Sequence, residues 1–258
     1  MWLCSGSPIN AEILAGAGLD WLMIDGEHAP LSLESIQRQL QVISAYGTTT
    51  VLRVPQNDTV TIYQMLDLGA QNILVPMVNT AADAERAVKA MHYPPRGVRG
   101  VGSALARGAR WNRVDGYLKR ASETVSLTVQ IETATAATNA AEIAAVDGVD
   151  AVFIGPSDLA ASMGHLGQQQ HPEVLAVIDG VIDAVHAAGK PVGVNAFAPD
   201  AQQRYLERGV DFMLAAADVS TLARASEQLA DAFCPPFGNA PRTGAEAHTP
   251  GNSRRESY

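Results

Sequence analysis

Short apolar runs alternate with amphipathic stretches along most of the chain. Eight runs have the length and the β-branched or aromatic content of buried strands. Between them, apolar residues recur at spacings of three and four, which is typical of a helix with one buried face. The predicted strands are Trp2–Ser5, Trp21–Asp25, Thr49–Arg53, Asn72–Val75, Ser126–Ile131, Ala151–Ile154, Pro191–Val194 and Phe212–Ala215. The predicted helices include Leu33–Tyr46, Ala81–Met91, Thr133–Ala145, Val174–Ala188 and Val219–Phe233.

A glycine stands just before several of these strands, where a preceding helix often ends in a left-handed residue. The positions are Gly18, Gly47, Gly69, Gly189 and Gly209. Eight such strand and helix units predict an α/β fold, a closed parallel (β/α)8 TIM barrel. An open doubly wound sheet is the structural alternative. That fold more often has a Gly-rich phosphate turn after its first strand, and no GxGxxG motif occurs there.

The pattern also predicts the domain boundaries. The chain has 258 residues, close to the roughly 250 residues of one barrel. The periodicity ends at Phe233, so residues 1–233 are predicted to form a single barrel domain. Residues 234–258 are rich in Pro, Gly, Asn, Ser and Arg and are predicted to be a disordered tail.

Charge and cysteine content exclude several classes of function. The net charge is −9 and the pI is about 5.1, which argues against a nucleic-acid partner and gives no attraction to anionic membranes. Cys4 and Cys234 form no CxxC motif, and free thiols in a reducing compartment are expected. Neither a signal peptide nor an apolar run of bilayer length is recognised. These features predict a cytoplasmic protein that acts on small molecules.

Active residues of a barrel lie at the C-terminal ends of its strands and in the loops that follow. Glu132 follows the fifth predicted strand and Asp158 follows the sixth, so the two carboxylates can converge. Two carboxylates with waters and a bidentate 2-oxo acid would complete an octahedral oxygen site suited to Mg²⁺ or Mn²⁺. The alternative is that both residues only cap the helices that follow them.

Arg53 and His28 also follow predicted strands. Arg53 ends an apolar strand, and its planar guanidinium suits a carboxylate or the oxygen of a developing enolate. Structural pairing with a nearby acid is the alternative for Arg53. His28 lies in the loop after the second strand and could act as a general base. A solvated loop histidine is the alternative for His28.

Lysine is informative because it is scarce. A Schiff-base aldolase needs a lysine amine inside the barrel. Lys89 and Lys119 fall on helical patterns, and Lys190 precedes the seventh strand, at the opposite rim from the chemistry. An aldol reaction on this chain would therefore use a metal and no imine. Four arginines in a long loop, Arg96, Arg99, Arg107 and Arg110, could bind an anionic substrate or line a subunit interface.

Five segments in register resemble the HpcH/HpaI aldolase family of class II, metal-dependent pyruvate aldolases. They are WLMIDGEHAP, LDLGAQNILVPMV, YPPRGVRGVG, VQIETATA and VFIGPSDLAASMG, and the likeness extends to about Phe233. The resemblance implies a modified barrel whose last helix is exchanged between paired subunits, commonly in a hexamer built as a trimer of dimers. It implies a divalent metal, Mg²⁺, Mn²⁺ or Co²⁺, and no organic cofactor.

The resemblance also implies roles for individual residues. The family's metal ligands fall on Glu132 and Asp158, its enolate-stabilising arginine on Arg53, and its proton-moving histidine on His28. Asp67 matches the carboxylate that orients this histidine. The remaining matches are a residue near the pyruvate at Gln130, the stretch that holds the pyruvate carboxylate at Gly155, Pro156, Ser157 and Asp158, and an acidic pair at the site entrance at Asp25 and Glu27.

The implied reaction converts a 4-hydroxy-2-oxo acid into pyruvate, or a hydroxylated pyruvate, and an aldehyde. Relatives usually have a longer segment before the first strand, and many have Ala where Ser157 stands. Three alternatives remain open at this point. The first is oxaloacetate decarboxylation or CoA-ester lyase chemistry at the same site, the second is a binding barrel without activity, and the third is a metal-free barrel for sugar phosphates.

Overall fold

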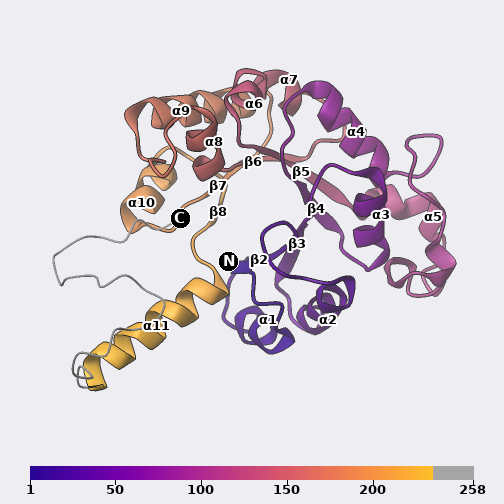
Figure 1. Cartoon of the computed structure of the whole chain (residues 1–258). Coiled ribbons are helices and arrows are strands. Elements are labelled where there is room, and N and C mark those ends of the chain that lie inside the picture. The colour runs from indigo at the N-terminus through magenta and orange to yellow at the C-terminus, as the bar shows by residue number, and fades with distance from the viewer. Residues whose placement is uncertain (235–258) are drawn as a thin grey trace.

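The computed structural model describes residues 1–234 and shows eight parallel strands in one sheet, ordered as in the sequence (Figure 1). A bridge between Trp2 and Ala217 joins the first strand to the segment after the last, so the sheet closes into the predicted (β/α)8 barrel. The strands are β1 (Trp2–Leu3), β2 (Trp21–Asp25), β3 (Thr49–Arg53), β4 (Asn72–Val75), β5 (Ser126–Ile131), β6 (Ala151–Ile154), β7 (Val192–Asn195) and β8 (Phe212–Leu214).

The helices form a ring outside the strands (Figure 1). They are α1 (Pro8–Ala15), α2 (Leu33–Ile43), α3 (Thr59–Asp67), α4 (Ala81–Met91), α5 (Tyr117–Arg120), α6 (Ala134–Thr138), α7 (Ala140–Ala144), α8 (Pro156–Ser162), α9 (Pro172–Ala187), α10 (Pro199–Glu207) and α11 (Asp218–Phe233). Side chains of Ser7, Ser32, Asp58, Thr80 and Thr133 cap the first turns of five of them.

The strand alternation divides the apolar residues into two clusters. Along β2, Leu22 and Ile24 face the helices, whereas Met23 joins an inner cluster with Leu74 and Phe153. The period of two continues to the strand ends, so Asp25, Arg53 and Gln130 also point into the barrel. Register matters here because Asp25 pairs with Arg53 across β2 and β3.

Several details differ from the sequence prediction. The strands β1, β7 and β8 and the helix α2 have bounds one to three residues away from those predicted. The predicted helix Thr133–Ala145 is divided into α6 and α7 at Asn139, whose side-chain amide donates to the carbonyl of Asn79 at 2.8 Å. Gly47 lacks the positive φ predicted for it, because α2 already ends at Ile43. The other four glycines named above do have positive φ.

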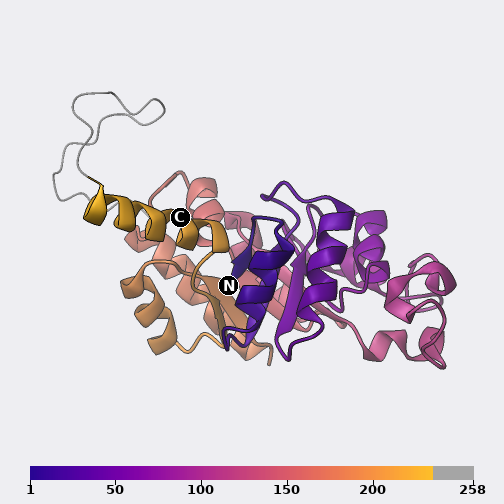
Figure 2. The same ribbon diagram turned by 90° about the horizontal axis from the view of Figure 1, so that it is seen from below.

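Helix α11 leaves the barrel wall and extends outward (Figures 1 and 2). Its first residue, Asp218, is buried and accepts hydrogen bonds from the backbone amides of Cys4 and Ser5. Further along, Leu222, Leu229 and Phe233 are exposed. Exchange of this helix between subunits stays a prediction. The predicted disorder of the tail also stays a prediction, because residues 235–258 lie outside the described part of the chain.

The long arginine-containing loop uses two of its arginines within the chain. Arg99 pairs with Asp67 at the C-terminal end of α3, and Arg107 donates to the carbonyl of Leu68. A helix of this fold runs antiparallel to the strands, so the end of α3 lies at the opposite rim from the strand ends that carry chemistry. Among residues 1–234, no helix is both long and apolar enough to cross a membrane.

Candidate active site

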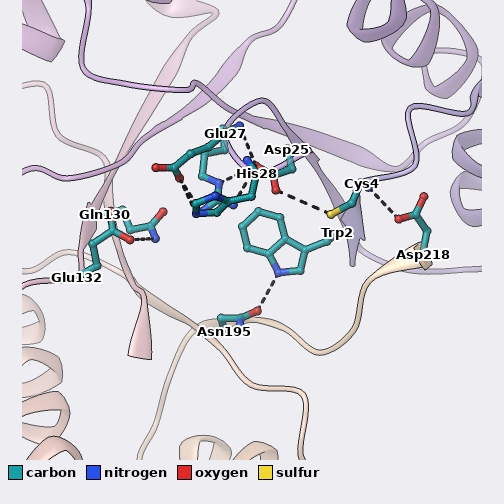
Figure 3. Close-up of polar contacts among 10 residues, drawn as sticks. Trp2, Cys4, Asp25, Glu27, His28, Gln130, Glu132, Asn195 and Asp218 are labelled. Atoms are coloured by element: carbon teal, nitrogen blue, oxygen red, sulfur yellow. Dashed lines mark hydrogen bonds and ion pairs between the residues drawn. The ribbon is translucent and has the colours of Figure 1, made fainter. Parts of the chain in front are cut away.

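A cavity of about 420 Å³ opens at the C-terminal ends of the strands. It brings together side chains that are far apart in the sequence (Figure 3). The lining residues include Trp2, Asp25, His28, Arg53, Gln130, Phe153, Gly155, Pro156, Ser157, Asp158 and Asn195. The structure thus gathers most of the predicted site residues around one hollow, as the strand-end rule predicts.

Arg53 is held in place by two acids and one aromatic ring. Its Nε and Nη2 lie 2.9 Å from Oδ1 of Asp25, and its Nη1 lies 2.9 Å from Oε2 of Glu27. Its guanidinium carbon lies 4.3 Å from the ring centroid of Trp2, which is cation–π geometry. The guanidinium is therefore fixed in orientation. Arg53 does pair with nearby acids, which was the alternative to a role in catalysis, but this pairing lies within the cavity itself.

The loop after β2 is shaped by Asp25 and Gly26. Asp25 Oδ1 accepts hydrogen bonds from the backbone amides of Glu27 and His28. The amide of Gly26 donates to the carbonyl of Arg53 at 2.9 Å, and a Cβ at Gly26 would lie only 2.5 Å from that oxygen. Only glycine allows this approach, so the sequence DGEH sets the positions of both Glu27 and His28.

Glu132 is buried directly after β5. Its Oε1 accepts a hydrogen bond from the amide of Met77 at 2.7 Å, and its Oε2 accepts a short one from the side-chain amide of Gln130. Burial raises the pKa of Glu132 to about 7, and the negative charges of Glu27 and Asp158 add to this effect. Met77 has φ of 55°, a strained conformation for its residue type that aims its amide at Glu132.

The stretch Gly155 to Asp158 joins β6 to α8. A Cβ at Gly155 would lie 2.8 Å from Nε2 of Gln130 and 3.0 Å from Oε2 of Glu132, so glycine is needed for their close packing. Asp158 lies in the first turn of α8. The Ser157 hydroxyl donates to Oε1 of Gln169 at 3.1 Å, so it is used by the loop that follows α8.

His28 and Asp67 lie in different places. The His28 side chain is 66% exposed at the cavity mouth, and its Nε2 lies 3.8 Å from Oε2 of Glu27. Asp67 pairs with Arg99 at 2.8 Å on the other side of the barrel. Within one chain the structure therefore brings together His28 and Glu27, but it does not bring Asp67 to His28.

The segments that carry these site residues also match a known protein family. A sequence model described as HpcH/HpaI aldolase/citrate lyase matches residues 1–225. The chain belongs to this family. It is therefore an aldolase of the metal-dependent, carbon–carbon-cleaving class, as the five segments predict.

Several relatives share almost the whole chain. It is 50% identical over 233 residues to the 4-hydroxy-2-oxo-heptane-1,7-dioate aldolase of Salmonella dublin, which covers 90% of this chain and 89% of the relative. A crystal structure of an HpcH/HpaI family protein from Burkholderia cenocepacia J2315 superposes with a TM-score of 0.87 at 39% identity, covering 90% of this chain and 92% of that one. The HpcH/HpaI aldolase of Desulfitobacterium hafniense DCB-2 gives a TM-score of 0.82 at 30% identity, covering 92% and 93%.

The residues of this family member fit a divalent cation. Asp25 and Glu27 pair with Arg53, and Glu132 lies close enough to Glu27, Asp158 and Arg53 for their charges to act on it. Burial raises the pKa of Glu27 as well as that of Glu132. Gln130 adds a buried side-chain oxygen without a hydrogen-bond partner among the described residues. This surplus of oxygen donors and negative charge is what a hard divalent cation requires.

Sequence reasoning missed Trp2 as a site residue. Its ring supports Arg53, and its Nε1 donates to Oδ1 of Asn195 at 2.8 Å (Figure 3). Asn195 ends β7, so the strand-end rule could have paired it with a donor from β1. Cys4 also lines the cavity, but burial, followed by the charges of Asp25 and Asp218, raises its pKa to about 12, so the thiol is not a nucleophile at neutral pH.

Proposed function

We propose that the chain is a divalent-metal-dependent lyase that cleaves and forms 4-hydroxy-2-oxo acids, with pyruvate or a hydroxylated pyruvate and an aldehyde as products. The observation that carries this proposal is the set of four carboxyl groups around one oriented guanidinium at the strand ends. The name of the Salmonella dublin relative makes 4-hydroxy-2-oxo-heptane-1,7-dioate the first substrate to test.

Glu132 and Asp158 would hold the cation, and Mg²⁺, Mn²⁺ and Co²⁺ are the candidates for a site made of oxygen donors. When bound, such an ion supplies Lewis-acid stabilisation of negative charge on the oxygens of a 2-oxo acid. Glu132 must be ionised to act as a ligand, and its hydrogen bonds from Met77 and Gln130 fix the orientation of its carboxylate beside Gln130, which lines the cavity.

Arg53 supports the same charge from the protein side. In the cleavage direction the C3–C4 bond breaks and its electron pair moves toward the 2-oxo oxygen, which becomes an enolate oxygen. A guanidinium already fixed by Asp25 and Glu27 needs no reorganisation to face that charge. Gln130 and the segment Gly155–Pro156–Ser157–Asp158 are assigned to the carboxylate end of the 2-oxo acid.

His28 is assigned to proton transfer. Its exposed ring at the cavity mouth can take the proton of the 4-hydroxyl group, directly or through a water, as the aldehyde forms. The enolate carbon C3 then receives a proton to give the methyl group of pyruvate. Asp67 pairs with Arg99 within its own chain. If Asp67 orients a catalytic histidine, as predicted, that histidine must therefore belong to another subunit.

We also propose a homo-oligomer in which α11 packs on a neighbouring subunit. The support is the outward course of α11 and the exposure of Leu222, Leu229 and Phe233 along it. Light scattering coupled to size exclusion tests this directly. A Leu222→Asp, Leu229→Asp double variant should shift the mass toward the monomer, and a wild-type monomer would refute it.

The test of the reaction is hydrogen exchange at the pyruvate methyl group, followed by NMR in D₂O. Metal-stripped protein should be inactive, added Mn²⁺ or Mg²⁺ should restore exchange, and Glu132→Gln should abolish it. Exchange that persists without metal, or that is unchanged in Glu132→Gln, would refute the proposed site. Exchange with oxaloacetate decarboxylation but no aldol product from any aldehyde would favour the alternative lyase chemistry.

A further inference from the structure

A second cluster of ligand-type side chains lies outside the cavity, on the loop that connects α8 to α9 and in the first turn of α9. His165, His171 and Glu173 have ligand atoms that all lie within 4.8 Å of one another. Within residues 1–234 no other three His, Cys, Asp or Glu side chains meet this condition. The two carboxylates assigned to the catalytic metal are not among them, so this cluster is a separate feature of the chain.

One distance in the cluster matches the spacing of two ligand atoms around a bound transition metal. Nε2 of His165 lies 3.0 Å from Oε2 of Glu173. Metal–nitrogen and metal–oxygen bonds of roughly 2.0–2.2 Å place two neighbouring ligand atoms about 3 Å apart. The rings of His165 and His171 stack with centroids 3.7 Å apart and an interplanar angle of 17°, so the second imidazole is beside the first but must turn before both nitrogens can point at one cation.

The donor types distinguish this cluster from the catalytic site. Imidazole nitrogens suit zinc, copper and nickel, whereas carboxylates and waters suit magnesium, calcium and manganese. Two imidazoles and one carboxylate leave a fourth position for water, which is a common arrangement for Zn²⁺. Glu173 lies in the first turn of α9, so its charge offsets the unfavourable effect of a helix N-terminus on a cation.

Metal binding would require local changes at both histidines, because the stacked rings must turn and Nε2 of His165 must exchange its hydrogen bond with Glu173 for the cation. Nδ1 of His171 accepts the amide hydrogen of Glu173 at 3.3 Å and thereby caps α9. A neutral imidazole has one ring proton, so coordination through either nitrogen gives up this contact or competes with it. The contact is at the long end for a hydrogen bond, and its loss is therefore a small cost.

We propose that His165, His171 and Glu173 form a second metal site on this chain, selective for Zn²⁺ and similar imidazole-preferring cations. The loop that carries it reaches the catalytic cavity through Gln169, which accepts the hydrogen bond from Ser157 beside Asp158. The same loop lines an outer cavity of about 900 Å³ that shares Pro156, Asn195 and Phe197 with the catalytic cavity.

The experiment is a titration with Zn²⁺, measured by isothermal titration calorimetry. The full-length, untagged protein is first stripped of metal and then kept in saturating Mg²⁺. Wild type should bind one Zn²⁺ per chain. His165→Gln should weaken Zn²⁺ binding at least about tenfold, because substitution of a residue that only supports a ligand can already lower metal affinity by that factor. His171→Asn should do the same while keeping a capping side chain on α9, and its circular dichroism melt checks that the helix remains folded.

Three control variants separate this cluster from other sites. His186 forms a histidine–carboxylate contact of the same 3.0 Å with Asp211 but has no second imidazole, so His186→Gln should leave Zn²⁺ binding unchanged. Glu132→Gln should also leave it unchanged, because the catalytic carboxylates are not ligands here. His248→Ala tests the remaining histidine near the C-terminus in the same way.

Cobalt substitution gives an independent readout. Co²⁺ held by two imidazoles should give visible absorption bands that disappear in His165→Gln and persist in His186→Gln. The proposal is overturned if wild type and His165→Gln bind Zn²⁺ equally, or if Glu132→Gln alone removes the binding. Neither result depends on aldolase activity, so the catalytic proposal and this one can fail separately.

Discussion

Arg53 and Arg99 are two buried arginines built in similar ways at opposite rims of the barrel. Arg53 pairs with Asp25 and stacks on Trp2, and Arg99 pairs with Asp67 and stacks on Tyr93. The difference lies in their surroundings. Arg53 faces an open cavity with a surplus of carboxyl groups, whereas Arg99 is 1% exposed and faces no such surplus.

This comparison teaches that burial and an acidic partner do not identify a catalytic arginine. Both arginines have those features, and both lie in segments typical of the family. The cavity and the uncompensated carboxyl groups distinguish Arg53, because only there can a guanidinium meet both a metal and an anionic substrate. Substitutions at the two positions should therefore affect different measured quantities.

The largest expected effect is on activity at the catalytic rim. Arg53→Ala should lower pyruvate methyl exchange and aldol cleavage by about 10²–10³-fold, because a preorganised charge facing the enolate oxygen is lost. Both rates are measured on protein shown to be folded by circular dichroism. Arg53→Lys should recover only part of the rate, since an ammonium cannot contact Asp25 and Glu27 as a planar fork does. Unchanged exchange in Arg53→Ala would remove the residue from the mechanism.

At the opposite rim the expected effect is on stability. Arg99→Ala should lower the free energy of unfolding by about 3 kcal/mol, because Asp67 loses its partner and the packing on Tyr93 is lost. Urea unfolding of the metal-free protein measures this. The exchange rate per folded molecule should stay within about twofold of wild type. A large fall in the exchange rate of Arg99→Ala without a loss of unfolding free energy would contradict the view that this rim serves stability and the other serves catalysis.

The pH dependence of metal binding tests the surplus of carboxyl groups. The pKa of Glu132 is raised to about 7 from 4.5, so the metal-free fold favours the protonated form. This contribution to stability is fully present below pH 4.5 and is lost as pH rises through 7. Because a cation binds the ionised form, its affinity should fall about tenfold per pH unit below 7 and level off above it.

Calorimetric titrations with Mn²⁺ between pH 5.5 and 8 measure this slope. The upward shift of the pKa corresponds to a cost on the order of 3 kcal/mol for ionising Glu132 in the absence of metal. Glu132→Asp serves as a comparison that keeps the carboxylate. A flat affinity profile across this range in wild type would mean that Glu132 is not a ligand.

The smallest effect is expected for Asp67→Asn, which keeps the shape of the side chain but removes its charge. The free energy of unfolding should fall by about 1–2 kcal/mol, since the hydrogen bond to Arg99 becomes a neutral one. Activity measured at high protein concentration tests its predicted role on a histidine of another subunit. A loss of exchange larger than the loss of folded protein would support that role, and parallel losses would leave Asp67 only as the partner of Arg99.

Much of the fold could be predicted because each strand has a local signal. The predicted bounds of β2, β3, β4, β5 and β6 are confirmed, since each has a short run of apolar and β-branched residues. The split at Asn139 could not be predicted, because it depends on a contact with Asn79, sixty residues away along the chain. Local periodicity contains no information on such contacts.

The candidate site was predictable as far as it follows strand ends. Glu132, Asp158 and Arg53 were found by that rule and by the family resemblance, and their roles stay predictions. The pairing of Arg53 with Asp25 needs the register of β2 and β3, and the contact of Trp2 with Asn195 needs barrel closure. The position of Asp67 could have been judged from topology, because a barrel helix ends at the rim opposite to the chemistry.

The barrel closure has a consequence for how the molecule comes apart. β1 is two residues long, and one bridge from Trp2 to Ala217 joins it to the segment after β8. The side chain of the same tryptophan supports Arg53 and binds Asn195. The joint that closes the barrel therefore also forms a wall of the catalytic cavity. A local opening at this joint would release the guanidinium and switch off catalysis while most of the barrel stays folded.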